Sequence, residues 1–529
     1  MAKKVALFAV VLMALLASCS NVGGPAVNLN INLGNEPPNL DQHTTTDTIS
    51  IQMLSLVVEG LVRYDDKGGY MPGMAEKWEV SPDGTVYTFT LRKGAQWSNG
   101  DPVKAEDFVY GLRRALDPAT ASEYAYILYP IKNAQAVNEG TLPVDQVGVA
   151  ADGNKVIYTL ERPTPYILSI LNFPTAMPGN QAFIEAQGAE YASEADKHLF
   201  NGPYTIQEWL HSDKIVLAKN PKYWNAKNIK LDTITGYMIA DSNTSITMFF
   251  NKELDMIGVP GTRLKDFTDK GYATPTYSDG AVFYLEFNTL DPVLANAKIR
   301  KALSFAVDRA AFTKNVLMDQ SQPAMSIVAP YISSGAGSIF RDVVPQYFND
   351  HDVAAAKAML AEGMQELGLT ELPAFSMISD DGDRAKSMAA AIQDMVRTAL
   401  GVEFTVDPMP FKARLQKMTD KDFQIVFAGW GPDYNDPMTF LDMWTTGNGN
   451  NHTSYASPAF DNLIVQATNE TDLAKRLEIL KSAEKMLMDD MPIAPVYFRM
   501  RNWAHQENIS GVVRRNVGPD PDLYWTVKK

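Results

Sequence analysis

Short runs of alternating or clustered hydrophobic residues recur along the chain, and they predict β-strands. From Val27 to Leu33 every second residue is aliphatic and the residues between them are asparagines, the period of a strand with one buried face. Clusters of β-branched and aromatic residues bounded by turn formers predict further strands. These lie at Val86–Leu91, Lys155–Leu160, Tyr204–Trp209, Lys214–Ala218, Phe283–Asn288 and Phe423–Ala428.

Apolar residues spaced three or four positions apart predict helices between these strands. One helix is expected to end at Leu116, where Asp117-Pro118 stops it. Other helices are expected at Ile49–Val62, Lys298–Phe312, Val353–Leu367, Ala385–Leu400, Thr439–Trp444 and Asp472–Met488. Because strands and helices alternate along the whole chain, the pattern predicts an α/β protein with mixed sheets.

The stretch Phe423–Trp444 carries the first candidate for binding chemistry. Its predicted strand ends at Gly429 and runs into a loop that holds Trp430, Tyr434 and the acids Asp433 and Asp436, without a basic residue. Aromatic walls beside an unpaired carboxylate suit a cation or an amine. The alternative is that the acids cap turns and the aromatic rings fill the core, and for Asp436 we expect a cap on the following helix.

Length and charge narrow the class of protein. A chain of 529 residues is too long for one hydrophobic core and is expected to form about three domains. Hydrophobic residues make up 46% and charged residues 21%, which is ordinary for a globular protein. The net charge of −15 argues against nucleic acid or an anionic membrane surface as a partner.

The N-terminus predicts export and a lipid anchor. Lys3 and Lys4 precede an apolar run, Val5–Ala17, that has signal-peptide proportions and is too short to span a bilayer. The run leads into Leu16-Ala17-Ser18-Cys19, which resembles a bacterial lipobox, so we expect cleavage after residue 18 and acylation of Cys19. Cys19 is the only cysteine, so no intramolecular disulfide is possible.

Four segments, in this order, resemble the extracellular solute-binding proteins of the peptide/nickel transport family, and most of all the oligopeptide-binding proteins that serve ABC importers. They read LRKGAQWSNGDPVKAEDFVYGLRRALDPATASEYA, NGPYTIQEW…IVLAKNPKYWN, FNTLDPVLANAKIRKALSFAVDR and AGWGPDYNDPMTFL. The resemblance implies a monomer that binds peptides, delivers them to permease subunits and touches the membrane through its lipid only, in a periplasm or on the cell surface.

The resemblance also implies a three-lobed clamshell of the class II peptide-binding type. The first lobe would combine residues 19–58, 179–280 and 500–529, after a signal peptide at 1–18. The second would be an insertion at 59–178 and the third would span 281–499. Two hinge crossings are expected near Gly280 and Arg499, with the ligand between the first and third lobes.

Site residues follow from the same resemblance. Asp433 matches the carboxylate that pairs with the peptide α-ammonium. The remaining expected ligand-binding residues are Gly429, Trp430 and Gly431 of a backbone-binding strand, Thr46 and Thr48 of the first lobe, Tyr124 of the second, and the aromatic residues Phe411 and Tyr434.

This chain departs from the family pattern at several positions. Ala281 and Gly431 stand where well-studied members carry a cysteine pair, and Thr46 replaces an acid. Met418 and Phe427 stand where some members have arginines near the peptide C-terminus. Arg384 and Lys386 are therefore the candidates for the cation that meets a ligand carboxylate, and the alternative for Arg384 is a solvated charge at the start of a helix.

Other functions remain as alternatives. A nickel, haem or non-peptide binder of the same fold is one, although the six histidines are scattered and no cofactor is expected. An exported hydrolase is another, but the chain lacks G-x-S-x-G, H-E-x-x-H and Walker motifs. His351-Asp352 and His452 have no evident partners, so we expect no enzyme. A lipid-tethered adhesin or holdase also fits the N-terminus.

Overall fold

The computed structural model describes residues 26–529, and Cys19 and the predicted signal peptide lie outside the described residues. In this range no helix has both the length and the apolar character needed to cross a bilayer.

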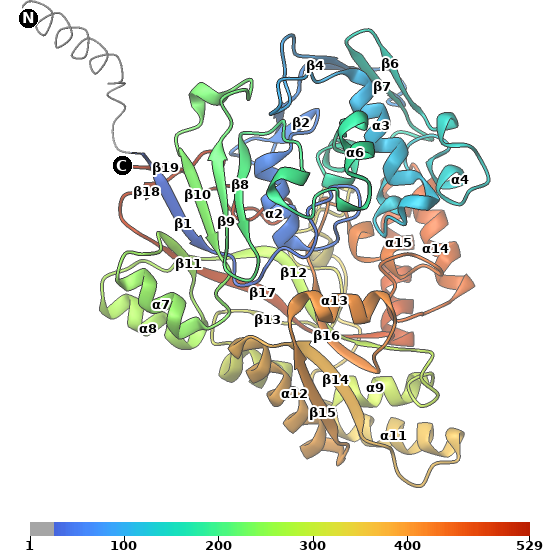
Figure 1. The fold of residues 1–529 in the computed structure, drawn as a ribbon. Coiled ribbons are helices and arrows are strands. Elements are labelled where there is room, and N and C mark those ends of the chain that lie inside the picture. Colours follow the sequence, from blue (N-terminus) through green and yellow to red (C-terminus); the bar gives the residue numbers. More distant parts are fainter. Residues whose placement is uncertain (1–25) are drawn as a thin grey trace, which may run out of the picture.

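A large mixed sheet of eleven strands runs through the molecule in the order β15-β14-β16-β12-β17-β11-β1-β10-β9-β8, with β13 paired to β17 (Figure 1). The pairs β14–β15 and β1–β10 are parallel, whereas β12 pairs antiparallel with β16 and β17. The strands are β1 (Asn28–Asn32), β8 (Tyr204–Leu210), β9 (Lys214–Lys219), β10 (Thr233–Tyr237), β11 (Met256–Gly258), β12 (Thr276–Phe287), β13 (Gln322–Pro323), β14 (Phe375–Asp380), β15 (Phe404–Met409), β16 (Ile425–Trp430) and β17 (Ile493–His505).

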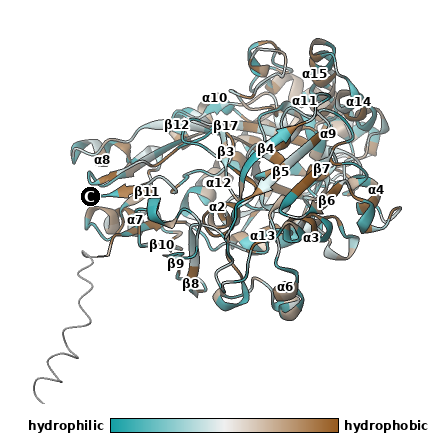
Figure 2. Ribbon diagram, turned by 90° about the horizontal axis from the view of Figure 1, so that it is seen from above, coloured by the Kyte–Doolittle hydropathy of each residue, from teal (hydrophilic) through white to brown (hydrophobic). Residues whose placement is uncertain are grey.

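A separate antiparallel sheet has the order β4-β5-β7-β6, and helix α3 (Ala105–Leu116) packs on β6 and β7. Figures 1 and 2 both place this sheet and α3 well away from β8–β10. Its strands are β4 (Ala75–Val80), β5 (Val86–Leu91), β6 (Val149–Asp152) and β7 (Lys155–Thr159), and two-stranded pairs form from β2 (Val62–Tyr64) with β3 (Tyr70–Pro72) and β18 (Ile509–Ser510) with β19 (Val527–Lys528).

Amphipathic helices cover the large sheet and close its cores. Helices α9 and α12 bury Leu303 and Ile392 against Ile425 of β16, since the apolar faces of helices and strands must be removed from water together. Besides α3, the helices are α2 (Thr48–Val57), α4 (Ala134–Asn138), α5 (Ile167–Leu171), α6 (Gln181–Gln187), α7 (Ser242–Phe250), α8 (Leu264–Asp269), α9 (Ala297–Phe305), α10 (Arg309–Ala311), α11 (Val353–Leu367), α12 (Asp383–Leu400), α13 (Phe411–Thr419), α14 (Pro458–Asn469) and α15 (Leu473–Asp490).

Strongly periodic segments form the elements that their patterns predict. In β1, Leu29 and Ile31 are buried while the asparagines on either side of them are not. Helix α11 has the predicted bounds, Val353–Leu367, and the hairpin β8–β9 lies where two strands were expected. The mixed α/β class is confirmed.

Three predicted elements have the wrong bounds. The helix from Ile49 ends at Val57, because Val62 begins a strand that pairs with β3. The helix expected at Lys298–Phe312 breaks after Phe305, and Asp308 caps a new short helix by accepting from the N–H of Ala311. The helix expected at Thr439–Trp444 is two short 3-10 turns, Pro437–Phe440 and Asp442–Trp444.

The strand predicted at Phe423–Ala428 is also displaced. Strand β16 begins at Ile425 and continues through Gly429 to Trp430, because Gly429 and Trp430 pair with Phe283 and Val282 of β12. Glycine therefore does not end this strand, since tertiary pairing overrides its low strand propensity.

Strand β12 changes register against β17 between Ser278 and Val282. Gly280 lies in this interval with φ +74°, and a Cβ there would approach the carbonyl oxygen of Asn516 to 2.3 Å, so no larger residue fits. The irregularity coincides with the hinge predicted near Gly280. The hinge itself and the lobe boundaries stay predictions.

Candidate functional site

A cavity of about 390 Å³ opens beside β16, and many parts of the chain line it, five of which carry the expected ligand residues or their neighbours. These are the start of α2, the turn at Glu123 and Tyr124, strand β12, helix α13 and the loop after β16. Of the residues expected to bind ligand, those lining it are Thr46, Thr48, Tyr124, Phe411, Gly429, Trp430, Gly431 and Asp433.

Asp433 is a buried carboxylate with spare hydrogen-bonding capacity. Its side-chain Oδ1 accepts a 3.3 Å hydrogen bond from the hydroxyl of Tyr124, and its main-chain N–H donates to Oγ1 of Thr439 at 3.0 Å. The second oxygen, Oδ2, has no hydrogen-bond partner among residues 26–529. No basic side chain in this range pairs with it either. Burial, helped by the charge of Asp442, raises the pKa of Asp433 well above its ordinary value.

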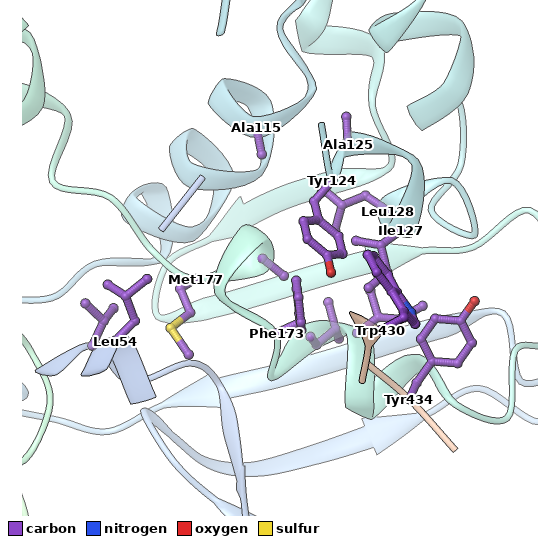
Figure 3. Packing of buried hydrophobic residues seen from close by; sticks show 14 of the residues in the cluster. Leu54, Ala115, Tyr124, Ala125, Ile127, Leu128, Phe173, Met177, Trp430 and Tyr434 are labelled. Carbon is purple, nitrogen blue, oxygen red and sulfur yellow. The ribbon is translucent and has the colours of Figure 1, made fainter. Parts of the chain in front are cut away.

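Aromatic rings surround this carboxylate. The rings of Tyr124 and Trp430 stack with centroids 5.8 Å apart, and Phe173 lies 4.9 Å from Tyr124; Figure 3 shows the three side chains side by side. The indole N–H of Trp430 donates to the carbonyl oxygen of Thr439 at 2.8 Å, which fixes the ring. The wall limits water access to Asp433 and strengthens any charge pair formed there.

One edge of β16 is open beside the cavity. Strand β14 pairs with β16 only at Ile425 and Val426, whereas β12 pairs with it as far as Trp430. Gly429 is exposed on the cavity side, and a Cβ there would lie 2.9 Å from the ring of Phe283. Backbone groups past Val426 are therefore placed to pair with an added strand.

The start of α2 forms the opposite wall. Asp47 caps this helix by accepting from the N–H groups of Ile49 and Ser50 at 3.0 and 2.9 Å. Burial raises the pKa of Asp47 to about 6. The cap holds Thr46 and Thr48 at the cavity, as the resemblance implies.

Three candidate ligand residues lie elsewhere. Tyr434 is buried, stacks on Tyr166 with centroids 4.6 Å apart and donates to Asp442 at 2.7 Å. It is absent from the cavity wall because its ring fills a core site. Arg384 is paired with Asp319 and lies outside the lining as well, and Lys386 is exposed outside it. Neither cation is placed to meet a ligand in this cavity.

A different cation, Arg414 of α13, lines the cavity. Its Nε donates to Asp380 Oδ1 at 2.6 Å, and its Nη1 contacts the sulfur of Met418 at 3.0 Å. A thioether is a weak acceptor for a guanidinium, so the group retains capacity for an anion. Arg414 and Met418 lie one helical turn apart in α13. Because Met418 stands where some members of the family have an arginine, this spacing was the signal in the sequence that pointed to Arg414.

An acid and a histidine also meet in the cavity wall. Nδ1 of His452 lies 3.8 Å from Oε2 of Glu286, and its Nε2 lies 3.9 Å from Glu123. The histidine thus has neighbours that its sequence context did not show. Burial raises the pKa of Glu286 to about 7. The described residues contain no cluster of three or more side chains suited to a metal.

Asp436 has the structural role expected of it. It caps the turn that starts at Pro437 by accepting from the N–H of Met438 at 3.0 Å. It also forms a two-pronged pair with Arg476, at 2.7 and 2.8 Å. Its carboxylate is therefore occupied, in contrast to that of Asp433.

The mixed sheets, together with a cavity that has aromatic walls, an open strand edge and a carboxylate unpaired within residues 26–529, define a ligand-binding protein of the solute-binding class. The chain belongs to the bacterial extracellular solute-binding proteins, family 5, whose model matches residues 69–452. The resemblance found in the four sequence motifs is thereby confirmed.

Characterised proteins match nearly the whole chain. The oligopeptide-binding protein OppA of Bacillus subtilis is 38% identical over 504 residues, which cover 93% of this chain and 91% of the relative. The substrate-binding domain of an oligopeptide ABC transporter from Bacillus anthracis superposes with a TM-score of 0.92 at 33% identity, covering 96% and 99% of the two chains. Listeria monocytogenes OppA bound to peptide gives 0.91 at 32%, covering 96% and 100%.

Proposed function

We propose that this protein captures peptides in the cavity beside β16 and delivers them to an ABC importer. The observation that carries the proposal is the buried Asp433, whose Oδ2 has no partner within residues 26–529. An ammonium group taken from water needs a charged, hydrogen-bonded partner, and Asp433 supplies one. The peptide-binding relatives support the same ligand class.

The strand edge gives the peptide its direction. A peptide whose amino end meets Asp433 and which pairs antiparallel with β16 runs back along this strand, toward the end of β14 where Asp380 accepts from Arg414 of α13. Its carboxyl end therefore points toward Arg414, in place of the expected Arg384. Main-chain pairing gives affinity that is independent of the peptide side chains, which suits a transporter of many peptides.

Anchoring and mechanics complete the proposal. Cys19 would carry the lipid that tethers the monomer to the outer face of a membrane. The protein would bind its ligand without acting on it as an enzyme. The lobes would divide at residues 58, 178, 280 and 499 and close by rotation about β12 and β17. The contact between Tyr124 and Asp433 joins the second and third of these lobes.

The test is mass spectrometry of ligands that co-purify with the protein expressed without its first 19 residues, followed by calorimetry on the stripped protein. We expect a mixture of short peptides and saturable binding of a free-amine peptide. Recovery of a metal complex or another non-peptide solute, together with no heat from peptides, would assign the cavity to a different ligand.

A further inference from the structure

A second cavity of about 920 Å³ lies apart from Asp433, where several segments of the chain meet. The two cavities have only Tyr64 and Ser169 in common among their lining residues. Its walls come from the β2–β3 turn, the segments 162–166 and 333–335, the start of α15, and the segment 514–517.

The lining is basic although the chain as a whole is acidic. Five cations outnumber three acids, namely Lys67, Arg162, Arg476, Arg514 and Arg515 against Asp66, Asp436 and Glu470. Arg476 is already neutralised by Asp436. Arg162 donates only to the amide oxygen of Asn469, at 2.8 Å. Among residues 26–529, neither Arg162 nor Lys67 has a carboxylate partner within 4 Å, so both charges remain available.

Two arginines, the buried Arg515 and the partly exposed Arg514, lie between this cavity and the first one. Arg515 pairs with Asp522 at 2.9 Å, and Arg514 lies 3.7 Å from Asp520. The two aspartates line the first cavity, whereas the arginines line the second. Nη1 of Arg514 and Nε of Arg515 have no hydrogen-bond partner in the described part of the chain. Both arginines therefore have one nitrogen without a hydrogen-bond partner among the described residues, and both line the second cavity.

Tyrosine rings supply a surface for an apolar body. Tyr64, Tyr70, Tyr166 and Tyr331 all line the second cavity. The guanidinium carbon of Arg515 lies 5.3 Å from the ring centre of Tyr64, so charge and ring face lie together. Flat molecules with anionic groups match such a combination, because rings stack on tyrosine while carboxylates or phosphates pair with arginine.

We infer that this second cavity binds a small organic anion with two or more carboxylate or phosphate groups on a flat body. The occupant would pair with Arg162 and Lys67 at the mouth and approach Arg514 and Arg515 between the two cavities. Because residues 64–70 and 162–169, residues 331–335 and 468–476, and residues 514–517 all line the cavity, the anion would tie all three predicted lobes together. This site is separate from the peptide cavity and does not depend on the proposed function.

The test titrates benzene-1,3,5-tricarboxylate into ligand-stripped protein without peptide, at ionic strength held constant with sodium chloride. We expect saturable one-to-one binding by calorimetry. Replacing both Arg162 and Lys67 by Gln removes two charge-assisted contacts, and we expect binding weaker by about tenfold or more. Lys67 is exposed and Arg162 is half-buried, and neither lies in a core, so the fold should survive, which circular dichroism checks.

Arg397→Gln is the matched control, because Arg397 is an exposed cation on α12 outside both cavities. It should bind the probe like the wild type. No saturable binding by the wild type, or equal weakening in the control and in the double variant, would overturn the inference and indicate general charge attraction only. Peptide binding is not measured in these titrations, so their outcome tests the anion site independently of the proposed peptide-binding function.

Discussion

The hydroxyl of Tyr124 donates a 3.3 Å hydrogen bond to Oδ1 of Asp433, across 309 positions of sequence. The contact joins the turn before Ala125 to the loop after β16, and both residues line the cavity. Since Oδ2 of Asp433 has no partner among residues 26–529, the bond orients the acid without neutralising it. A ligand ammonium would complete the site.

The first prediction concerns the charge of Asp433. Asp433→Asn keeps the shape but removes the charge, and losing one member of a buried pair typically costs about 2–5 kcal/mol. We expect free-amine peptide to bind roughly thirty- to several-thousand-fold more weakly. N-acetylation of the peptide should harm the wild type to a similar degree and add little loss to the variant.

Calorimetry on the four combinations of protein and peptide measures this coupling. Both proteins should have the same circular dichroism spectrum, which controls for folding. If Asp433→Asn binds free-amine peptide as tightly as the wild type, the amine pocket lies elsewhere.

The second prediction tests Arg414 as the partner of the peptide carboxylate. Arg414→Gln should weaken binding of a free-carboxylate peptide by about tenfold or more, because a charge-assisted hydrogen bond is lost. A C-terminally amidated peptide should bind the wild type and the variant about equally. Lys412→Gln, an exposed cation of the same helix, is the control and should change neither titration. Equal loss for both peptides would assign Arg414 a structural role.

The third prediction is a pH dependence of stability set by Glu286. Burial raises its pKa from 4.5 to about 7, against the lowering effect of His452 and Arg414. Between these values the folded protein binds more protons than the unfolded chain, so Glu286 destabilises the fold progressively as pH rises.

Glu286→Gln removes this cost. We expect the ligand-stripped variant to be more stable than the wild type at pH 8, by on the order of 1–3 kcal/mol, and little different at pH 4. Denaturant unfolding at the two pH values measures the difference. A gain that is the same at both values would show that the ionisation of Glu286 is not its source.

The fourth prediction is lobe closure on binding. Ligand-stripped protein should have a larger radius of gyration than peptide-saturated protein in small-angle scattering, because a ligand that contacts both lobes favours the closed state. Complete removal of cellular peptides before the measurement is the necessary control. Identical scattering profiles with and without saturating peptide would argue against rotation at β12 and β17.

The fifth prediction concerns Cys19, which lies outside the described residues. Metabolic labelling with a fatty-acid probe should mark the wild type and leave Cys19→Ala unlabelled. Immunoblotting for both proteins controls for expression. Label of equal intensity on the two would rule out acylation at this cysteine.

Local pattern in the sequence determined most of the elements and the family. The alternation around Leu29 and Ile31 predicted a half-buried strand, and the periodicity from Val353 to Leu367 predicted a helix. Both predictions succeeded because each pattern depends only on residues close together in the sequence. The four motifs indicated the class of protein, and together with the loop after β16 they made Asp433 the predicted partner of a ligand amine.

Tertiary structure decided which side chains from distant parts of the sequence meet. Arg384 pairs with Asp319 and Tyr434 stacks on Tyr166, so neither reaches the cavity, whereas Arg414 does. Strand β16 passes through Gly429 because β12 pairs with it from more than a hundred residues away. Such outcomes depend on contacts between distant segments and on which charges are buried together, and local periodicity carries no information about either.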